Sequence, residues 1–441
     1  MRRELAADQR GKRGRLESDL RFNLSNGGNP RLAQTRPRCD FDWGMKTLPE
    51  SHGDLAEQVD EFMKDESNHT QDGRLAPPAT AAGVKSDDMS RFEGEGGRVA
   101  PEERVQARQP DTPAWKKIVA QYQKPSLGRA LWQMVNTIGP YIALWYLMYL
   151  SMAVSWWLTV PLAILAGGFM VRVFIIFHDC GHGSFFKSRK ANNILGFITG
   201  VLTLTPYSHW RGEHAAHHAT SGDLDRRGVG DIWTLTVLEY LEASRWKRFA
   251  YRLARNPLVL FVLAPLFVFL VRHRIPKAWA NQRERRSVYW TNLAVLAMAA
   301  GLTWVFGLKA YLLIQLTVLT VAGAVGFWLF YVQHQFDGVY WERGESWDFT
   351  ASALQGSSFY KLPRVLQWFS GNIGYHHIHH LSSRIPNYNL TRCHQAHPLF
   401  QSVKPVTLFS SFKSLTFRLW DERRRKLVGY RHLRIFRRQQ S

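Results

Sequence analysis

The feature that most restricts how this chain can fold is a series of long apolar segments that follow a polar first quarter. Four segments have the length of a bilayer-crossing helix, which needs about 20 apolar residues for a core of about 30 Å. They span residues 131–154, 158–177, 288–308 and 310–332. Because lipid cannot satisfy backbone polar groups, each segment must form an α-helix. We therefore predict an all-α integral membrane protein with four transmembrane helices.

The charges around these segments predict their orientation. Arg and Lys are dense in the stretches 245–255, 272–286 and 422–438, and basic flanks tend to stay on the cytoplasmic side of a membrane. Only Lys309 separates the last two apolar segments, which indicates a tight helical hairpin. We expect a multi-pass membrane protein built from two hairpins, with the connecting region and the active site facing the cytoplasm.

A fifth apolar segment, residues 257–271, carries Pro265 in its middle. Its length of 15 residues is short for a span, and basic residues flank it on both sides. A crossing here would also place the histidine motifs before and after it on opposite sides of the membrane. We therefore predict an interfacial or re-entrant segment.

The first quarter of the chain differs from the rest. Residues 1–112 are polar and lack a sustained apolar pattern, so they bury too little apolar surface to offset chain entropy. We predict a disordered polar extension over 1–112 and one membrane domain over 113–441. The whole chain has 57 Lys and Arg against 35 Asp and Glu, a formal charge of +22. Beside 17 Trp and the apolar segments, this charge favours membrane lipid over nucleic acid as a partner.

Histidines are the candidate metal ligands of this chain. Its three cysteines, Cys39, Cys180 and Cys393, are widely separated, which excludes a disulfide framework and a cysteine-ligated iron–sulfur cluster. By contrast, histidines gather in the motifs HDCGH, HAAHH and HHIHH near the ends of apolar segments, with one more in YVQHQF. The nine candidate catalytic and metal-binding residues are His178, His182, His214, His217, His218, His334, His376, His379 and His380.

The spacing within the motifs predicts two metal ions. Residues three or four positions apart share one face of a helix, so HxxxH and HxxH each direct two imidazoles at one point. The adjacent histidine of HxxHH lies about 100° round the helix and would face a neighbouring ion. Imidazole binds iron, zinc, copper and nickel, but nine ligands exceed the three or four that a protein gives to zinc. We predict a centre of two iron ions.

Acidic residues near the motifs are candidates for orienting the ligand rings, because a carboxylate can accept the second ring N–H. They are Asp179, Glu213, Asp223, Asp225 and Asp231. Asp223 and Asp225 can instead pair with Arg226 and Arg227, and solvated loop acids give the same pattern. Six other histidines are not expected to be metal ligands: His209, His273, His377, His394, His397 and His432. Of these, His209 and His377 can still support the site by contacting the ligands.

The same motifs carry a resemblance to a known family. HDCGHGSFF (178–186), PYSHWRGEHAAHHATSGDLDRRGVGD (206–231) and GNIGYHHIHHLSSRIPNYNL (371–390) resemble the three histidine boxes of the membrane fatty acid desaturases. The stretch FRLWDERRRKLVGY near the C-terminus matches as well. The IPNYNL that follows the third box is similar to the omega-6, Δ12-type acyl-lipid branch of that family.

The resemblance implies a four-span fold whose cytosolic helical cap holds a di-iron centre, with the iron ligands on the nine histidines named above. In better-understood relatives, an Asn that holds a bridging water lies four residues before the histidine matching His334. Here Phe330 occupies that position. The implied reaction inserts a cis double bond into a long acyl chain, carried as a lipid or a thioester, and consumes O2.

An external electron donor, ferredoxin-like or cytochrome, is expected because the sequence contains no flavin, haem or cluster motif. A basic cytoplasmic face suits an acidic donor, and equally anionic lipid. Two alternatives stay open: a related di-iron membrane hydroxylase or ketolase, and a non-catalytic membrane metal-binding protein. Aromatic residues near the spans are candidates for lining an acyl tunnel: Trp210, Phe185, Trp328 and Tyr375.

Overall fold

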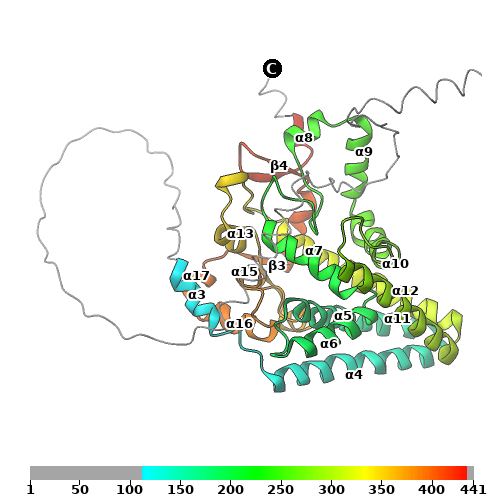
Figure 1. The fold of residues 1–441 in the computed structure, drawn as a ribbon. Helices are drawn as coiled ribbons and strands as arrows, with labels where there is room; N and C mark the ends of the chain where they lie inside the picture. Colours follow the sequence, from blue (N-terminus) through cyan, green and yellow to red (C-terminus); the bar gives the residue numbers. More distant parts are fainter. Residues whose placement is uncertain (1–111, 435–441) are drawn as a thin grey trace, which may run out of the picture. The chain divides into compact units, whose positions relative to one another are not determined.

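The computed structural model describes residues 112–434, so the extension predicted over 1–112 lies outside the described residues except for its last position. The described part is mostly helical (Figure 1). Its four long helices coincide with the four predicted spans. They are α4 (Leu127–Met152), α5 (Trp156–His182), α11 (Gln282–Phe306) and α12 (Leu308–His334).

Three of these helices, α5, α11 and α12, are long and apolar enough to cross a membrane. The fourth, α4, is 26 residues long but is not among the candidates that the described residues offer, and it carries the polar Arg129, Gln133 and Asn136. Both α5 and α12 continue past their apolar runs and end on a histidine, His182 and His334. The helices therefore extend the predicted spans by the turns that carry the candidate ligands.

Small residues bring α5 and α12 close together. A Cβ at Gly167 of α5 would lie 2.5 Å from Val321 Cγ1 of α12, and one at Gly323 would lie 2.7 Å from Pro265 Cβ. Neither position tolerates a side chain without movement. The middle of α5 therefore packs closely against α12, and α12 packs closely against the segment that contains Pro265.

The connections also agree with the predicted hairpins. Gly307 alone separates α11 from α12 with a φ of +80°, a conformation that glycine adopts without steric cost. The apolar segment 257–271 forms a π-helical turn (η1, Val259–Leu263), α10 (Ala264–Leu270) and then a 3-10 turn (η2, Arg272–Arg274). Together with α9 (Arg245–Ala254) it makes a pair bent by 66°, the geometry of a broken span or a re-entrant loop. Its interfacial or re-entrant placement stays a prediction.

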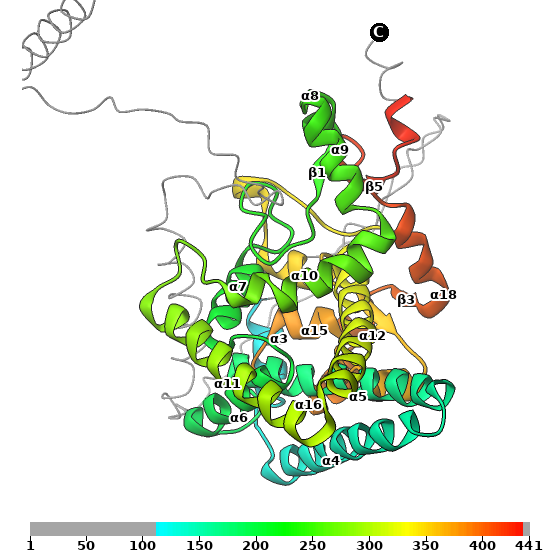
Figure 2. The ribbon, with the colours of Figure 1, turned by 90° about the vertical axis from the view of Figure 1, so that its right-hand side faces the viewer.

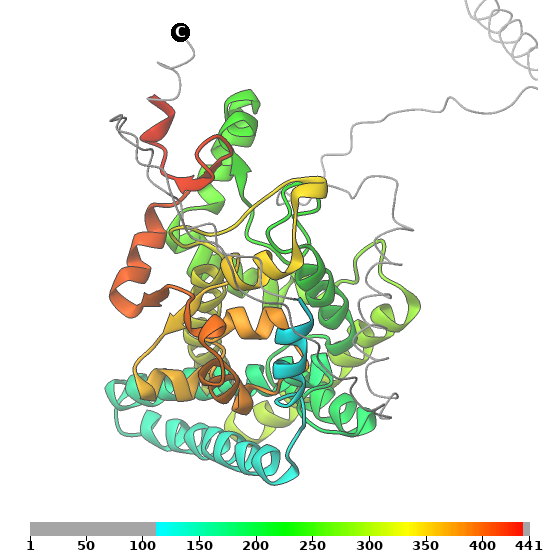
Figure 3. The same cartoon turned by 90° about the vertical axis from the view of Figure 1, so that its left-hand side faces the viewer.

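Short helices cover the ends of α5 and α12. After α5 come α6 (Arg189–Leu202), α7 (Tyr207–Thr220) and α8 (Val237–Glu242). The region after α12 contains η3 (Gly344–Ser346), α13 (Phe349–Gln355), α14 (Arg364–Phe369), α15 (His376–Leu381), α16 (Asn387–Gln395), α17 (Pro398–Gln401), α18 (Leu408–Ser411) and η4 (Phe412–Thr416). Helix α3 (Thr112–Ala120) packs against this region through Trp115 and Val119, which share a core cluster with Leu390 and Phe400 (Figure 3).

Short strands within the described residues depart from the all-α prediction. β1 (Leu235–Thr236) pairs in parallel with β4 (Leu419–Asp421), which pairs in antiparallel with β5 (Lys426–Val428). β2 (Phe359–Lys361) pairs in parallel with β3 (Pro405–Thr407). Strands of two or three residues are too short to show an alternating pattern, and so the sequence does not reveal them.

Candidate metal centre

The first histidine motif lies on the last turns of α5. His178 and His182 are four residues apart on one face, with ring centroids 4.7 Å apart. Gly183 follows in the left-handed region with a φ of +68° and ends the helix directly after His182, a common way of terminating a helix. The chain then leaves α5 with both imidazoles at its end.

The second and third motifs lie on α7 and α15, which meet at the ends of α5 and α12 (Figure 2). The turn before α15 contains Gly371 at a φ of +54°, where a Cβ would lie 2.7 Å from Ile175 Cγ2 of α5. This close approach brings the third motif against α5, only three residues before His178.

All nine candidate histidines fall into two groups whose ligand nitrogens lie within 4.8 Å of one another. The five-histidine group contains His178, His182, His214, His218 and His379. The four-histidine group contains His217, His334, His376 and His380. In α7 and in α15 the residues four apart enter one group and the third histidine enters the other, so each HxxHH motif contributes to both groups.

The distances within the groups fit shared metal ions. Histidine nitrogens lie about 2.0–2.1 Å from a bound divalent ion, so neighbouring ligand nitrogens of one ion are roughly 2.8–3.4 Å apart for ligand angles between 90° and tetrahedral. The Nε2 atom of His334 lies 3.1 Å from that of His217 and 2.9 Å from that of His376. The Nε2 atom of His218 lies 3.2 Å from that of His214 and 3.0 Å from that of His379.

Buried ring nitrogens without a hydrogen-bond partner also support metal binding by the two groups. Within the described residues, His182 Nε2 and His380 Nε2 are buried and have no hydrogen-bond partner. A buried polar atom without a partner costs about 1–3 kcal/mol, and coordination of a metal ion would satisfy one such nitrogen in each group. The chemistry of nine imidazoles therefore fits two metal ions.

Outer partners fix the orientation of three rings. Asp231 Oδ1 lies 2.6 Å from His217 Nδ1, and Asp179 Oδ1 lies 3.2 Å from His178 Nδ1. The Gly356 carbonyl lies 3.2 Å from His334 Nδ1. When Nδ1 carries the proton for these acceptors, Nε2 presents its lone pair to the ion.

Asn387 completes the arrangement around Asp179. Its backbone N–H and its side-chain amide both donate to Asp179 Oδ2, at 2.7 and 2.8 Å. Asn387 is the Asn that follows Pro in IPNYNL, so the motif that carried the family resemblance holds the first histidine box in place. Its contact with Asp179 is not evident from the sequence, in which only the position of Asn387 after the third box signals a role.

The other three candidate acids have different partners. Asp223 pairs with Arg226 at 2.6 Å, as one of the alternatives predicts. Asp225 pairs with Arg343 rather than with Arg227. Glu213 forms a buried ion pair with Lys277. Burial by itself raises the pKa of the Glu213 carboxyl, but Lys277 and then His209 outweigh it and hold that pKa below its usual value.

Burial keeps five candidate ligand imidazoles of α7 and α15 neutral. It lowers the pKa of His214, His218, His376, His379 and His380 well below the usual histidine value, and neighbouring imidazoles lower it further. A neutral imidazole is the form that binds metal. The protein environment thus favours metal binding over protonation.

The remaining histidines lie outside the two groups. His377 points away from the centre, with Nε2 3.2 Å from His394 Nδ1 and 3.1 Å from the Phe400 carbonyl. His432 pairs with Asp421, and His397 caps α17. Phe330 lies against the four-histidine group, with its ring 5.2 Å from His217 and 5.3 Å from His334.

An inner cavity of about 350 Å³ leads to the centre. Apolar side chains of α5, α10 and α12 form most of its wall, and His178, His214 and His376 line it. Of the four aromatic residues suggested for a tunnel, Trp210 lines this cavity. The other three pack elsewhere: Phe185 against Phe186, Trp328 against Tyr360, and Tyr375 against Phe359.

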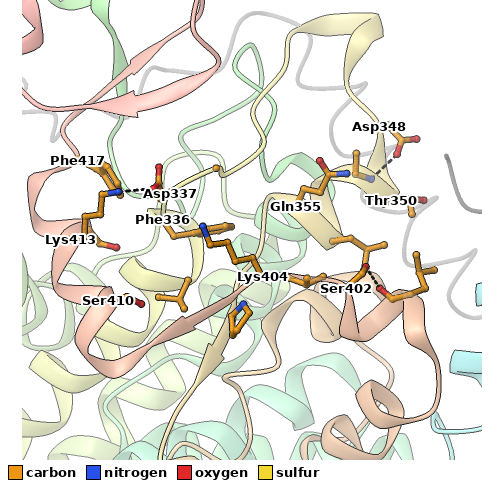
Figure 4. A pocket seen from close by; sticks show the side chains of 18 residues that line it. Phe336, Asp337, Asp348, Thr350, Gln355, Ser402, Lys404, Ser410, Lys413 and Phe417 are labelled. Carbon is orange, nitrogen blue, oxygen red and sulfur yellow. Dashed lines mark hydrogen bonds and ion pairs between the residues drawn. The ribbon is translucent and has the colours of Figure 1, made fainter. Parts of the chain in front are cut away.

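A larger hollow of about 800 Å³ lies near α13, β3 and η4 (Figure 4). Asp337 and Lys413 form an ion pair of 2.6 Å at one side of it, and Asp348 caps α13 at the other. No histidine is among its lining residues. Of these two hollows in the described residues, the inner cavity is the one lined by candidate metal ligands.

The fold and the site together define a helical protein with membrane-length apolar helices and two histidine groups arranged to bind metal. A model of the fatty acid desaturase family matches residues 155–405. A fatty acid desaturase of Bacillus subtilis is 50% identical over 318 residues, which cover 72% of this chain and 90% of that protein. The chain belongs to the fatty acid desaturase family, whose members are oxidoreductases.

More distant relatives act on acyl lipids, according to their names. An sn-1 acyl-lipid omega-3 desaturase (ferredoxin) of Synechocystis is 29% identical, over 64% of this chain and 77% of that protein. An sn-1 oleoyl-lipid 12-desaturase of Synechocystis is 26% identical, over 58% of this chain and 70% of that protein.

Proposed function

We propose that the protein is an oxygen-dependent di-iron desaturase that inserts a cis double bond into a long acyl chain of a membrane lipid. The observation that carries the proposal is the convergence of nine histidines into two groups at the end of an apolar cavity. Family membership and the names of the acyl-lipid relatives support the substrate class.

Iron suits the site because unactivated C–H bonds need the one-electron and O2 chemistry that a redox metal supplies. In balance, the acyl chain loses two hydrogens, an external donor supplies two electrons, two protons are taken up from water, and O2 is reduced to two waters. Ferredoxin-like or cytochrome donors suit that role, and ferredoxin appears in the names of three relatives. The nine histidines are the proposed ligands, and Asp179, Asp231 and the Gly356 carbonyl are proposed to hold three of the rings.

The protein itself positions the acyl chain at the metal centre and shields it from water. The apolar wall of the inner cavity excludes water and binds methylenes through the hydrophobic effect, and His178, His214 and His376 mark where the chain meets the ions. How far an acyl chain enters sets the position of the double bond. The Δ12 or omega-6 position remains a prediction from the IPNYNL motif, since relatives named for omega-3 and for position 12 both resemble this chain.

The proposed setting is a multi-pass membrane protein with its active site on the cytoplasmic side. Residues 113–441 form the proposed membrane domain, with four spans and a cytosolic cap. Candidate spans α5 and α12 carry histidines at the same end, so the two groups assemble on one side of the membrane. The basic stretches of the same region favour the cytoplasmic side.

Expression in a host rich in monounsaturated acyl chains tests the proposal. Mass spectrometry of the lipids should show chains that have lost two hydrogens, in a manner that depends on O2. His217→Ala should abolish the product and leave membrane insertion intact, because it removes one ligand of the four-histidine group. His397→Asn is the matched control, since His397 caps α17 and lies outside both histidine groups, and Asn is a good capping residue.

The same experiment separates the alternatives. A hydroxylase or ketolase would add oxygen to the chain instead of removing two hydrogens. A non-catalytic metal-binding protein would bind metal but leave the lipid unchanged and consume no oxygen. Full activity of His217→Ala would overturn the proposed centre.

A further inference from the structure

Helix α9 (Arg245–Ala254) presents an apolar stripe to the outside of the described protein. Trp246, Phe249 and Leu253 are 81%, 59% and 46% exposed. They follow one another at spacings of three and four residues, so they share one face of the helix. An exposed face of large apolar side chains marks a surface that contacts something other than water.

Basic residues flank this stripe, and α9 contains no acidic residue. Arg245, Lys247 and Arg248 form no ion pair with a carboxylate of the described residues. Arg252 donates to the Tyr240 hydroxyl at 2.7 Å and lies over the Tyr430 ring. A partner for this helix must therefore offer both an apolar surface and negative charge.

The opposite face of α9 is fixed to the protein. Tyr251 is fully buried, and its hydroxyl accepts from the Leu235 N–H and donates to the Arg418 carbonyl. These contacts attach α9 to the sheet formed by β1, β4 and β5. The apolar stripe faces away from that sheet.

Arg255 sets the depth of α9 relative to the candidate span α12. Its guanidinium is buried and donates to Gln335 Oε1 at 2.9 Å and to the Phe417 carbonyl at 3.0 Å. Gln335 directly follows His334, the last residue of α12. The end of α9 is therefore level with the C-terminal end of α12.

The direction of α9 agrees with this depth. Figures 1 and 2 show α9 running across the direction of α5, a candidate span. The segment that follows, Val259–Arg274, bends away from α9 by 66°. Exposed Leu258 and Leu263 continue the apolar surface into that segment. A helix in the plane of the membrane surface, followed by a segment that turns inward, has this geometry.

We propose that α9 lies in the cytoplasmic surface of the membrane, with its stripe among the acyl chains and its basic residues on anionic lipid headgroups. Helices with a Trp, Phe and Leu face and Lys and Arg flanks bind lipid surfaces in this manner. The inference rests on the membrane placement proposed above and is independent of the reaction. In this position, α9 holds the sheet of β1, β4 and β5 against the membrane at a second place besides the spans. Through Arg255 it also holds Gln335, the residue next to His334, at this depth.

Depth measurement by spin labelling tests the proposal on the full-length protein in liposomes of phosphatidylcholine and phosphatidylglycerol. Labels are attached one at a time in Trp246→Cys, Phe249→Cys and Leu253→Cys, in a Cys39→Ser background. The other two cysteines, Cys180 and Cys393, are buried. Glu345→Cys, on the exposed η3 turn, is the water-facing control.

Insertion predicts that the three stripe labels meet dissolved oxygen far more than a water-soluble nickel chelate, whereas the label at residue 345 shows the reverse. Nickel access at the stripe equal to that at residue 345 overturns the proposal, since the stripe would then face water. Low access to both reagents also overturns it, because a protein partner or a second copy would then cover the stripe.

A charge-reversal pair tests the choice of anionic lipid. Lys247→Glu with Arg248→Glu should lower the oxygen-to-nickel ratio at residue 249 in liposomes that contain phosphatidylglycerol. Arg424→Glu with Lys426→Glu makes the same change of charge near β5 and should leave the ratio unchanged. Equal effects of the two pairs would contradict a specific role of α9. Lipid analysis of the wild type is read separately, so failure of desaturation and failure of α9 insertion are distinguishable.

Discussion

Replacing Asp231 by Asn tests how the protein prepares a histidine for its ion. Asp231 Oδ1 accepts the N–H of His217 Nδ1 at 2.6 Å, and Oδ2 accepts the Gly228 N–H at 3.1 Å. With the proton on Nδ1, His217 Nε2 offers its lone pair at the position 3.1 Å from His334 Nε2. The carboxylate thus satisfies two donors and selects one tautomer.

An amide at this position can satisfy only one of the two donors. If its oxygen faces His217, its NH2 group meets the Gly228 N–H. If its NH2 group faces His217, the amide favours the tautomer of His217 with the proton on Nε2. A protonated Nε2 has no lone pair for a metal ion. Loss of such an outer partner typically costs 10–100-fold in metal affinity, or about 1.4–2.8 kcal/mol.

Anaerobic titration of the metal-free protein with ferrous iron measures this effect. In Asp231→Asn we expect the four-histidine group to lose affinity 10–100-fold, while the five-histidine group keeps the affinity of the wild type. Asp225→Asn is the control: it removes an exposed ion pair with Arg343, and such pairs contribute little. Unchanged affinity of both groups in Asp231→Asn would refute the reasoning.

Three further predictions concern His377, the inner cavity and the stability of the protein at low pH. His377→Leu should keep the metal content of the wild type but lose about 1–3 kcal/mol of stability, because it leaves the Phe400 carbonyl without its donor; loss of metal in this variant would contradict its exclusion from the ligands. Gly326→Phe should fill the cavity and lower turnover on long chains with metal retained, since a Cβ there meets nothing within 4 Å. Gly323→Phe should instead reduce folded yield, because a Cβ there already lies 2.7 Å from Pro265; equal behaviour of the two variants would count against the cavity. Burial lowers the pKa of His214, His218 and His376 in the folded chain, so below about pH 6.5 the unfolded chain binds more protons. The metal-free protein should therefore be fully stable above that pH and melt at a lower temperature at pH 5.5 than at pH 7.5, and an equal or higher melting temperature at pH 5.5 would show the sign to be wrong.

The sequence predicts the long helices well because their signal is local. Apolar runs of about 20 residues force helices in lipid, and α5, α11 and α12 follow the predicted segments with turns added at their ends. Helical spacing also predicts that the histidines of one HxxHH motif divide between two neighbouring ions, without saying which pair stays together. The structure groups these residues in that way.

Features that depend on distant contacts escape such reasoning. Nothing local in IPNYNL indicates that Asn387 donates twice to Asp179, 208 positions earlier in the chain. The pairing of Asp225 with Arg343 crosses 118 positions and replaces the nearer Arg227. The stretch 245–255 reads as a basic flank, whereas its role as an amphipathic surface helix depends on Tyr251 and Arg255 being buried by residues after 330.

Metal analysis of the purified, iron-loaded protein tests the central claim most directly. Two groups of imidazoles, each with its nitrogens within 4.8 Å, predict two iron ions per chain, with one of them lost in His334→Ala. A protein that holds no iron after loading, or that holds a single zinc ion that His334→Ala does not disturb, would contradict the account.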